Sequence, residues 1–163
     1  MKEKETEITD MFNIVLVNPE IPPNTGNISR TCAVTGTRLH LIRPLGFEIN
    51  DKTLKRAGLD YWKDLDVSYY DSFEELEAKY PDGRFFWASA HATRSYADVE
   101  YMDGDFLVFG RETAGLGPEL LKRRAKDAIR IPMRHDQRSL NLSNSAAIVL
   151  YEALRQTGFQ GLE

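Results

Sequence analysis

Short apolar runs alternate with amphipathic segments along the chain, which is the pattern of strands separated by helices. The run "FNIVLV" is almost continuously apolar, as is typical of a strand buried on both faces of a parallel sheet. Strands that alternate with helices predict a mostly parallel α/β sheet with helices covering both faces. The apolar runs predict strands over 12–17, 38–42, 67–70, 84–89, 105–110 and 128–132.

Capping residues and helical spacing predict the helices. Asp71 or Ser72 caps one helix, which a Pro-Asp-Gly turn ends, and Pro118 opens another. The last helix has apolar residues at helical spacing after Leu142, and Gly158 ends it. Further helices are predicted over 26–36 and 52–57.

The approach to the last helix carries more polar side chains than a helix start needs. Within "RSLNLSNS" these are Ser139, Asn141, Ser143, Asn144 and Ser145. One or two hydroxyl or amide groups are enough to cap a helix. The surplus therefore indicates a second role for this segment.

Composition indicates one globular domain over residues 11–163, preceded by a mobile extension of ten mostly polar residues. The chain is 42% hydrophobic and has no apolar run near the length of a membrane-spanning helix. Its N-terminus lacks the apolar core of a secretion signal, so we expect a cytoplasmic protein. The only cysteine, Cys32, falls in a helix pattern and is expected to be buried.

Four connections are candidates for the functional site, because parallel α/β sheets bind ligands at the carboxyl ends of their strands. All four are rich in Gly, Pro, Asn and Ser, and the last two are long for a compact domain. They are "NPEIPPNTGN", "SAHATRS", "GRETAGLGP" and "PMRHDQRSLNLSNS".

Charge is unevenly distributed along the chain. The formal net charge of −4 argues against a protein that coats nucleic acid by bulk charge. The stretch from Lys122 to Arg138, however, holds seven basic side chains against two aspartates. Such a run is either a solvated helix face or a contact surface for phosphates, and it leads directly into the polar segment before the last helix.

Several common chemistries do not match. "GRETAGLG" differs from the G-x-G-x-x-G of dinucleotide folds, and no phosphate loop of NTPases is present. His40, His91 and His135 lack the spacing of metal ligands, so we expect structural or surface histidines and no metal site. Ser143 lies in no nucleophile elbow.

Two segments offer positive signals. In "IPPNTGNISR", Asn24 or Thr25 can cap a helix, and Arg30 is expected about one turn inside it. An arginine there opposes the helix dipole, which favours a phosphate or carboxylate partner, although a well-made helix start explains the segment equally. "GRETAGLG" combines three glycines with one carboxylate, Glu112.

Together, "PEIPPNTGNISRTCA", "DGDFLVFGRETAGL" and "IRIPMRHDQRSLNLSNSAAIVLYEAL" resemble the three motifs of the SPOUT superfamily of RNA methyltransferases. The resemblance runs from about Met11 to Gly158 and includes "RAGLDYW". It is greatest to the small TrmL (YibK-like) branch, whose members methylate the ribose 2′-oxygen of the wobble nucleotide, a cytidine or modified uridine, in certain tRNAs.

This resemblance implies a C-terminal deep trefoil knot that forms a pocket for S-adenosylmethionine. A knot would bury irregular backbone, and the surplus Ser and Asn side chains would then satisfy its polar groups. The resemblance also implies a homodimer that packs the first and last helices together, with Tyr151 and Leu154 in or near the interface. The implied cofactor contacts are Ala88, Gly110, Ile131, Ser139 and Leu140.

The same resemblance implies roles in catalysis. Arg30 matches the active-site arginine, and a guanidinium suits a cation that holds phosphate and stabilises a developing alkoxide better than it suits a base. Asn24 and Glu112 would orient Arg30 or the ribose, and Ser143 and Asn144 would shape the loop. The implied contacts to the anticodon stem-loop are Lys122, Arg123, Arg124, Arg134 and Arg138.

Two alternatives remain open at this level. One is a methyltransferase of the same fold that acts on ribosomal RNA, although the RNA-binding extension of larger relatives is missing. The other is an RNA-binding or assembly factor that keeps the fold without catalysis. The match at Arg30, Gly110 and Ser139 favours an enzyme, and we expect a few leucine tRNAs as its substrates.

Overall fold

The structure is a computed structural model that describes residues 11–49, 65–137 and 139–163. Three sequence predictions lie outside the described residues. These are the mobile extension over 1–10, the helix over 52–57 and the phosphate contact of Arg138. The sheet and the loops at its carboxyl edge belong to the described part, so the remaining predictions about the site can be examined.

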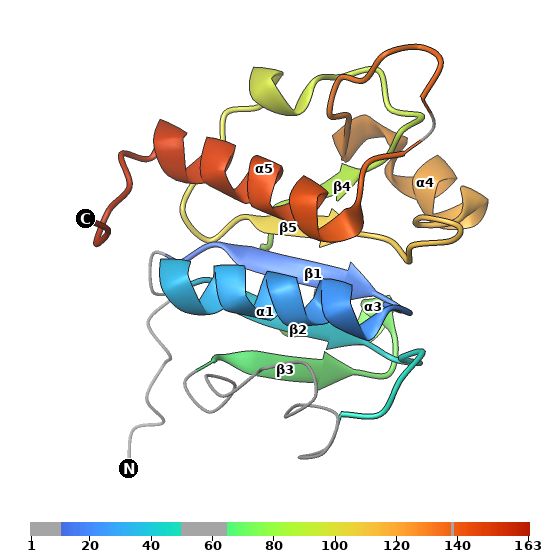
Figure 1. Cartoon of the computed structure of the whole chain (residues 1–163), viewed down its shortest axis with the longest axis horizontal. Helices are drawn as coiled ribbons and strands as arrows, with labels where there is room; N and C mark the ends of the chain where they lie inside the picture. Colours follow the sequence, from blue (N-terminus) through green and yellow to red (C-terminus); the bar gives the residue numbers. More distant parts are fainter. Residues whose placement is uncertain (1–10, 50–64, 138) are drawn as a thin grey trace.

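Six strands form one sheet in the order β3-β2-β1-β5-β4-β6 (Figure 1). All five strand pairs are parallel, which confirms the predicted sheet. From β1 the chain adds β2 and β3 on one side of the sheet, and β4 to β6 lie on the other side of β1. Such a switch between neighbouring strands, here β1 and β5, opens a crevice at the carboxyl ends of the strands. The strands are β1 (Asn13–Val17), β2 (Arg38–Ile42), β3 (Val67–Tyr70), β4 (Phe85–Ala88), β5 (Phe106–Phe109) and β6 (Ala128–Ile129).

Helices cover both faces of the sheet, as predicted. α1 and α5 lie side by side on one face (Figure 1), and α3 and α4 pack against the other. The α-helices are α1 (Pro22–Thr35), α3 (Phe73–Lys79), α4 (Pro118–Arg124) and α5 (Leu142–Gln156). Two 3₁₀ turns, η2 (Tyr96–Asp98) and η3 (Ala125–Asp127), complete the described elements.

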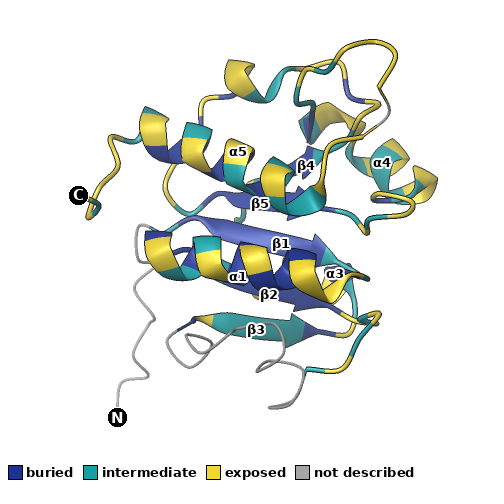
Figure 2. Ribbon diagram, in the orientation of Figure 1, coloured by how far each residue is buried: buried dark blue, intermediate teal, exposed yellow. Residues whose placement is uncertain are grey.

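β1 is buried along nearly its whole length (Figure 2), and its side chains pack alternately on the two faces of the sheet. Ile14 and Leu16 pack in the cluster that contains Leu150 of α5, whereas Val15 packs in the cluster that contains Leu76 of α3. All five side chains are fully or almost fully buried. β1 is therefore buried on both sides, and the loop after it is anchored to the centre of the fold.

The start of α1 differs from the prediction. The helix begins at Pro22 rather than Gly26, because proline is compatible with the first helical turn, where the N–H has no partner inside the helix. Ile21 is the N-cap residue and provides no side-chain cap, so the prediction that Asn24 or Thr25 caps the helix is wrong. Arg30 is consequently more than two turns inside α1, and the helix-dipole argument for an anion beside it does not hold.

β6 is shorter than the predicted strand over 128–132 and ends at Ile129. The backbone of Arg130 instead forms hydrogen bonds to the connection after β4, donating to the Arg94 carbonyl at 2.8 Å and accepting from the Tyr96 amide at 2.9 Å. The chain thus leaves the sheet before Pro132 and runs toward the carboxyl edge.

The polar residues before α5 have a different role from the predicted one. Asn141 caps the helix, since its side chain accepts from the Asn144 amide at 3.2 Å. Ser143 Oγ donates to Asn141 Oδ1 at 2.6 Å, and Ser145 Oγ donates to the Asn141 carbonyl at 3.0 Å. Residues 139–145 are exposed or half-buried, so these groups satisfy one another around Asn141 rather than serving buried irregular backbone.

Buried polar side chains link β1, β2 and β3 through hydrogen bonds. His40 Nε2 lies 2.8 Å from Asn13 Oδ1, and His40 Nδ1 lies 3.0 Å from the Tyr70 hydroxyl. The Asn13 amide group donates to the Gly104 carbonyl at 3.0 Å, so its oxygen accepts from His40 Nε2. His40 is structural, as predicted, and Cys32 is buried, as predicted, with a thiol pKa that burial raises to about 12.

We expect His40 to stay neutral across the physiological range. Burial, followed by the charges of Lys79 and Arg38, lowers the pKa of His40 to about 3. An unfolded histidine binds a proton near pH 6.5, so the contribution of His40 to stability is complete above that pH and is lost as the pH falls toward 3. NMR of the imidazole should show no titration between about pH 8 and 5, whereas a titration near 6.5 would contradict the burial of His40.

Candidate active site

One cavity of about 630 Å³ lies at the carboxyl edge of the sheet. All four predicted loops contribute to it: Ile21 and Asn24 after β1, His91 after β4, Glu112 after β5 and Ser139 after β6. Its size is that of a small-molecule or cofactor site. The four loops that the rule for parallel sheets selected from the sequence thus meet at one cavity.

The walls are mixed in character. Phe109, Leu116 and Ile131 give apolar surface, whereas Ser89 and Asn141 give polar groups. Apolar walls with a few convergent polar groups suit an adenine ring and a charged amino-acid group. All five residues predicted to contact the cofactor line this cavity: Ala88, Gly110, Ile131, Ser139 and Leu140.

The fold of the loop after β5 requires a glycine at position 110. A Cβ at this position would lie 2.1 Å from the Gly115 carbonyl carbon and 2.3 Å from the Leu116 nitrogen. The glycine is therefore needed for the loop to fold back on itself. A larger residue would displace the loop, and not simply fill space that a cofactor needs.

Asn24 and Asn141 join the two helices at the cavity. Asn24 is 8% exposed, and its Oδ1 accepts from Asn141 Nδ2 at 3.2 Å. Asn141 in turn accepts from Ser143 and Asn144, so three of the predicted catalytic residues meet at this one side chain. The sequence marked Asn141 only as one of several polar residues, although an amide at a helix N-cap was the available signal.

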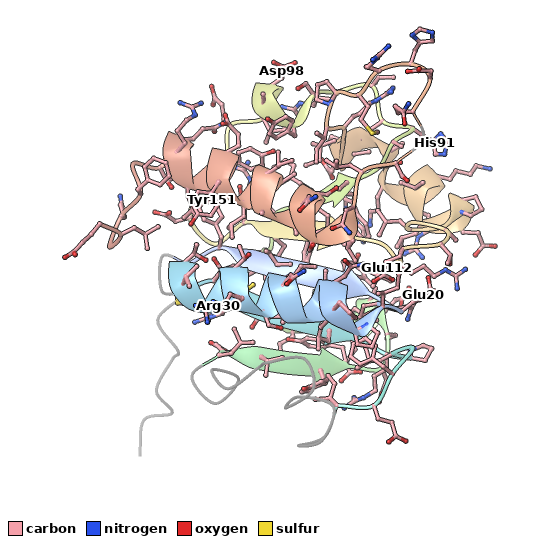
Figure 3. All side chains as sticks on the ribbon, in the orientation of Figure 1. Glu20, Arg30, His91, Asp98, Glu112 and Tyr151 are labelled. Atoms are coloured by element: carbon pink, nitrogen blue, oxygen red, sulfur yellow. The ribbon has the colours of Figure 1, made fainter. Side chains whose placement is uncertain are left out.

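The Glu112 carboxylate binds backbone at the start of α1. Its Oε2 accepts from the Glu20 amide at 2.8 Å, and its Oε1 accepts from the Ile21 amide at 3.2 Å. Figure 3 shows Glu20 and Glu112 together at this end of α1, with Arg30 further along the helix. Arg30 is exposed and is not among the described residues that line the cavity.

Of the predicted RNA contacts, two arginines pair with acids of α3. Arg124 pairs with Glu77 and lies 5.8 Å from the centre of the Trp87 ring, and Arg123 lies 3.7 Å from Glu74. Lys122 is exposed. Arg134 is 86% exposed and lies 3.7 Å from Asp136.

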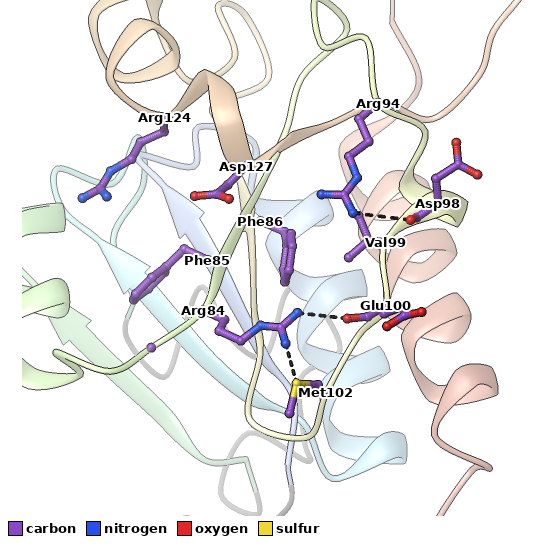
Figure 4. A pocket seen from close by; sticks show the side chains of 11 residues that line it. Arg84, Phe85, Phe86, Arg94, Asp98, Val99, Glu100, Met102, Arg124 and Asp127 are labelled. Carbon is purple, nitrogen blue, oxygen red and sulfur yellow. Dashed lines mark hydrogen bonds between the residues drawn. The ribbon is translucent and has the colours of Figure 1, made fainter.

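A second cavity, of about 650 Å³, lies beside β4 (Figure 4). Its arginines make contacts within the protein: Arg84 donates to the Glu100 carbonyl at 2.9 Å and to the sulfur of Met102, and it pairs with buried Asp105 at 3.2 Å. Arg94 donates to the Asp98 carbonyl at 3.4 Å. Because these arginines are already bonded within the protein, the cavity at the carboxyl edge remains the better candidate.

Two classes of site are not found in the described part of the chain. Residues 11–49, 65–137 and 139–163 contain no group of His, Cys, Asp and Glu side chains arranged to hold a metal ion. Within the same ranges, no helix has the length and apolar character to cross a membrane.

Comparisons with known proteins agree on one family. A protein of Listeria innocua is 56% identical over 153 residues, which are 92% of this chain and 90% of its own. A protein of Saccharophagus degradans, named tRNA (cytidine(34)-2′-O)-methyltransferase, is 51% identical over 93% of this chain and 99% of its own. A crystal structure from Bacillus anthracis superposes with a TM-score of 0.90 at 51% identity, covering 93% of this chain and 98% of that one.

More distant structures identify the cofactor of the family. The SpoU methyltransferase AviRb of Streptomyces viridochromogenes, solved with S-adenosylmethionine, superposes with a TM-score of 0.78 at 25% identity over 91% of this chain and 58% of its own. S-adenosylmethionine is the methyl donor of the family. The sequence profile of the SpoU rRNA Methylase family matches residues 11–151, and the chain therefore belongs to this family.

Proposed function

We propose that this protein methylates the ribose 2′-oxygen of the wobble nucleotide of tRNA, with S-adenosylmethionine as the donor. The observation that carries the proposal is the identity of 49–51%, over nearly the full length of each chain, to proteins named tRNA (cytidine(34)-2′-O)-methyltransferase. A structure from work on 2-OH methylation of C/U34 on tRNA supports it, with a TM-score of 0.84 at 46% identity.

The cavity at the carboxyl edge fits the cofactor. Ile131 and Leu140 would hold the adenine between apolar walls, and the backbone around Gly110 and Ser139 would bind polar groups. The bound cofactor supplies an electrophilic methyl group on a sulfonium. The protein then has to exclude water, orient the ribose hydroxyl and ease the loss of its proton.

Asn24 is placed to orient the ribose. Its carbonyl oxygen accepts from Asn141, which leaves its NH₂ group as the donor for a hydroxyl or phosphate in the cavity. Ser143 and Asn144 act on the site through Asn141, which they hold in position. Glu112 fixes the start of the helix that carries Asn24.

Arg30 acts as the cation of the reaction. It binds the RNA phosphate and stabilises negative charge that develops on the ribose oxygen, since a guanidinium stays protonated in proteins. Because Arg30 lies on the outer surface of α1, we infer that it serves the site of a second protomer.

A homodimer through α1 and α5 supports this arrangement. Asn27, Arg30 and Val34 form an exposed stripe on α1, and Ile148 and Tyr151 continue the surface on the neighbouring α5. Val34 is 57% and Tyr151 45% exposed, whereas Leu154 is only 7% exposed and packs in the core of its own protomer. The exposed apolar side chains suit an isologous interface between two copies.

The path of the chain after β6 supports a knot. β6 lies at the edge of the sheet beyond β4, yet α5 packs beside α1 and over β5 on the far side of β4. The connection also pairs with the segment after β4 through Arg130. We infer that this C-terminal part is threaded to form the deep trefoil knot.

Lys122 and Arg134 are the phosphate contacts that the structure favours, with Arg123 and Arg138 beside them in the sequence. Arg124 is half-buried against Glu77 and Trp87, so its first role is structural. Lys122→Ala with Arg134→Ala should lower the salt dependence of tRNA binding by about two logarithmic units of slope, one for each lost phosphate contact. Arg124→Ala should instead lower the melting temperature, and an unchanged slope in the double variant would remove this basic stretch from the interface.

We infer that the substrates are a few leucine tRNAs in the cytoplasm. Labelled S-adenosylmethionine, incubated with the enzyme and separated RNA classes, should label tRNA and leave ribosomal RNA unlabelled. Purified isoacceptors should then show that leucine tRNAs accept the label. Label confined to ribosomal RNA would favour methylation of ribosomal RNA, the activity for which the family is named. Cofactor binding without transfer to any RNA would favour an RNA-binding factor.

A further inference from the structure

We propose that Glu20 is a positioning residue of the cofactor cavity. The carboxylates of Glu20 and Glu112 lock the loop after β1 to the loop after β5, and this lock gives the cavity wall the shape that binds S-adenosylmethionine. The inference rests on the proposed function only in taking the cavity as the cofactor site. Nothing in the motif chemistry of the sequence had assigned a role to Glu20.

Each loop contributes one carboxylate that accepts hydrogen bonds from the other loop. Glu112 of the second loop accepts from the Glu20 and Ile21 amides of the first, at 2.8 and 3.2 Å. Glu20 of the first loop accepts from Thr113 of the second, with its Oε1 3.1 Å from the amide nitrogen and 2.7 Å from the hydroxyl oxygen. Four hydrogen bonds to charged acceptors thus join segments more than 90 positions apart in the chain.

The start of α1 needs this lock. The first two helical residues are prolines without an N–H, and the Asn24 amide donates to the Ile21 carbonyl at 3.1 Å. The donors at the helix start that need an outside acceptor are therefore the amides of Glu20 and Ile21, just before the helix. Glu112 supplies acceptors from outside the helix, so the loop after β5 is part of the helix start. Exposed Ile21, whose amide is part of the lock, lines the cavity, and so does buried Asn24, three residues further along.

The loop after β5 behaves as a compact unit. The Gly115 amide donates to the Arg111 carbonyl at 2.8 Å, and Gly110 packs closely against Gly115 and Leu116. Hydrogen bonds from Thr113, first from its hydroxyl and then from its amide, lower the pKa of Glu20, so the acceptor is a carboxylate at neutral pH. The lock thus positions the whole of this compact loop against α1.

The Glu20 and Glu112 carboxylates use their oxygen atoms differently, so replacement by glutamine should affect them differently. Both bonds to Glu20 end on one oxygen, Oε1, and a glutamine keeps that acceptor. The bonds to Glu112 use both oxygens, so a glutamine there turns an NH₂ donor toward an amide donor. A general loss of stability would not distinguish the two glutamine variants in this way.

Calorimetry of S-adenosylmethionine binding is the measurement. Glu20→Ala and Glu112→Gln should each weaken binding about tenfold, whereas Glu20→Gln should stay within about twofold of the wild type. Thr113→Val should weaken binding about threefold in the wild type and add nothing to Glu20→Ala, because the hydroxyl acts through Glu20. Glu100→Gln, which removes the same charge from an exposed site away from the cavity, should have no effect.

The outcomes separate the two proposals. A wild-type protein that does not bind the cofactor overturns the proposed function and the lock with it. A wild type that binds, with Glu20→Ala or Thr113→Val of unchanged affinity, overturns the lock alone. Equal losses in Glu20→Gln and Glu20→Ala, at equal melting temperatures, also contradict it, because the argument depends on one retained oxygen.

Discussion

Arg30→Ala should lower kcat/KM for tRNA by about two to three orders of magnitude, the loss typical of a donor that stabilises transition-state charge. Affinity for S-adenosylmethionine should stay within about twofold, because Arg30 does not line the cavity of its own chain among the described residues. Steady-state transfer of labelled methyl groups and calorimetry of the cofactor measure the two quantities separately.

The position of Arg30 explains why its loss should lower turnover but not cofactor affinity. It lies on the exposed surface of α1, more than two turns from Ile21, where a partner protomer or bound RNA can reach it. Arg43→Ala is the matched control, because it removes an exposed arginine that pairs with Asp71, away from the α1–α5 surface and from the lining of the cavity. Near-normal turnover by Arg30→Ala, or a loss as large in Arg43→Ala, would remove Arg30 from the reaction.

Asn141→Asp should lower turnover by about ten- to a hundredfold while the melting temperature changes little. Aspartate keeps the acceptor that caps α5 through the Asn144 amide, but it loses the Nδ2 donor to Asn24. The Asn24 amide would then face a carboxylate and turn its own NH₂ group toward it, away from the ribose.

Comparing Asn141→Ala with Asn141→Asp separates the cap of α5 from the link to Asn24. The alanine variant loses both functions and should also destabilise the protein by about 1 kcal/mol, the usual cost of a lost N-cap. Asn24→Ala combined with Asn141→Asp should cost little more in turnover than Asn24→Ala alone, since both act through one contact. Additive losses in that pair would show that Asn141 acts independently of Asn24.

The sequence located the candidate site because its signals are local. Apolar runs mark the parallel strands, and the rule for their carboxyl ends then brings Asn24, Gly110 and Ser139 to one cavity. The predicted parallel pairing is confirmed, because every described strand pair is parallel. The family resemblance added which of the residues at that edge to examine.

Contacts between segments that are far apart in the sequence could not be predicted in this way. The Glu20 lock joins loops through backbone amides, and no spacing of residue types reveals such a contact. Sequence reasoning starts α1 at Gly26 and so places Arg30 too close to the N-terminus, whereas the helix begins with Pro22 and Pro23. A role for Arg30 across two protomers depends on an assembly that one sequence does not describe.

The most direct test of the central claim compares two synthetic anticodon stem-loops of a leucine tRNA. They are identical except that one carries a 2′-deoxyribose at the wobble position. The account predicts that labelled methyl groups enter the ribose of the wobble nucleotide in the first stem-loop and that the second stays unlabelled, because the accepting oxygen is absent. Equal labelling of both, or label mapped to any other nucleotide, would contradict the claim that the wobble 2′-oxygen is the methyl acceptor.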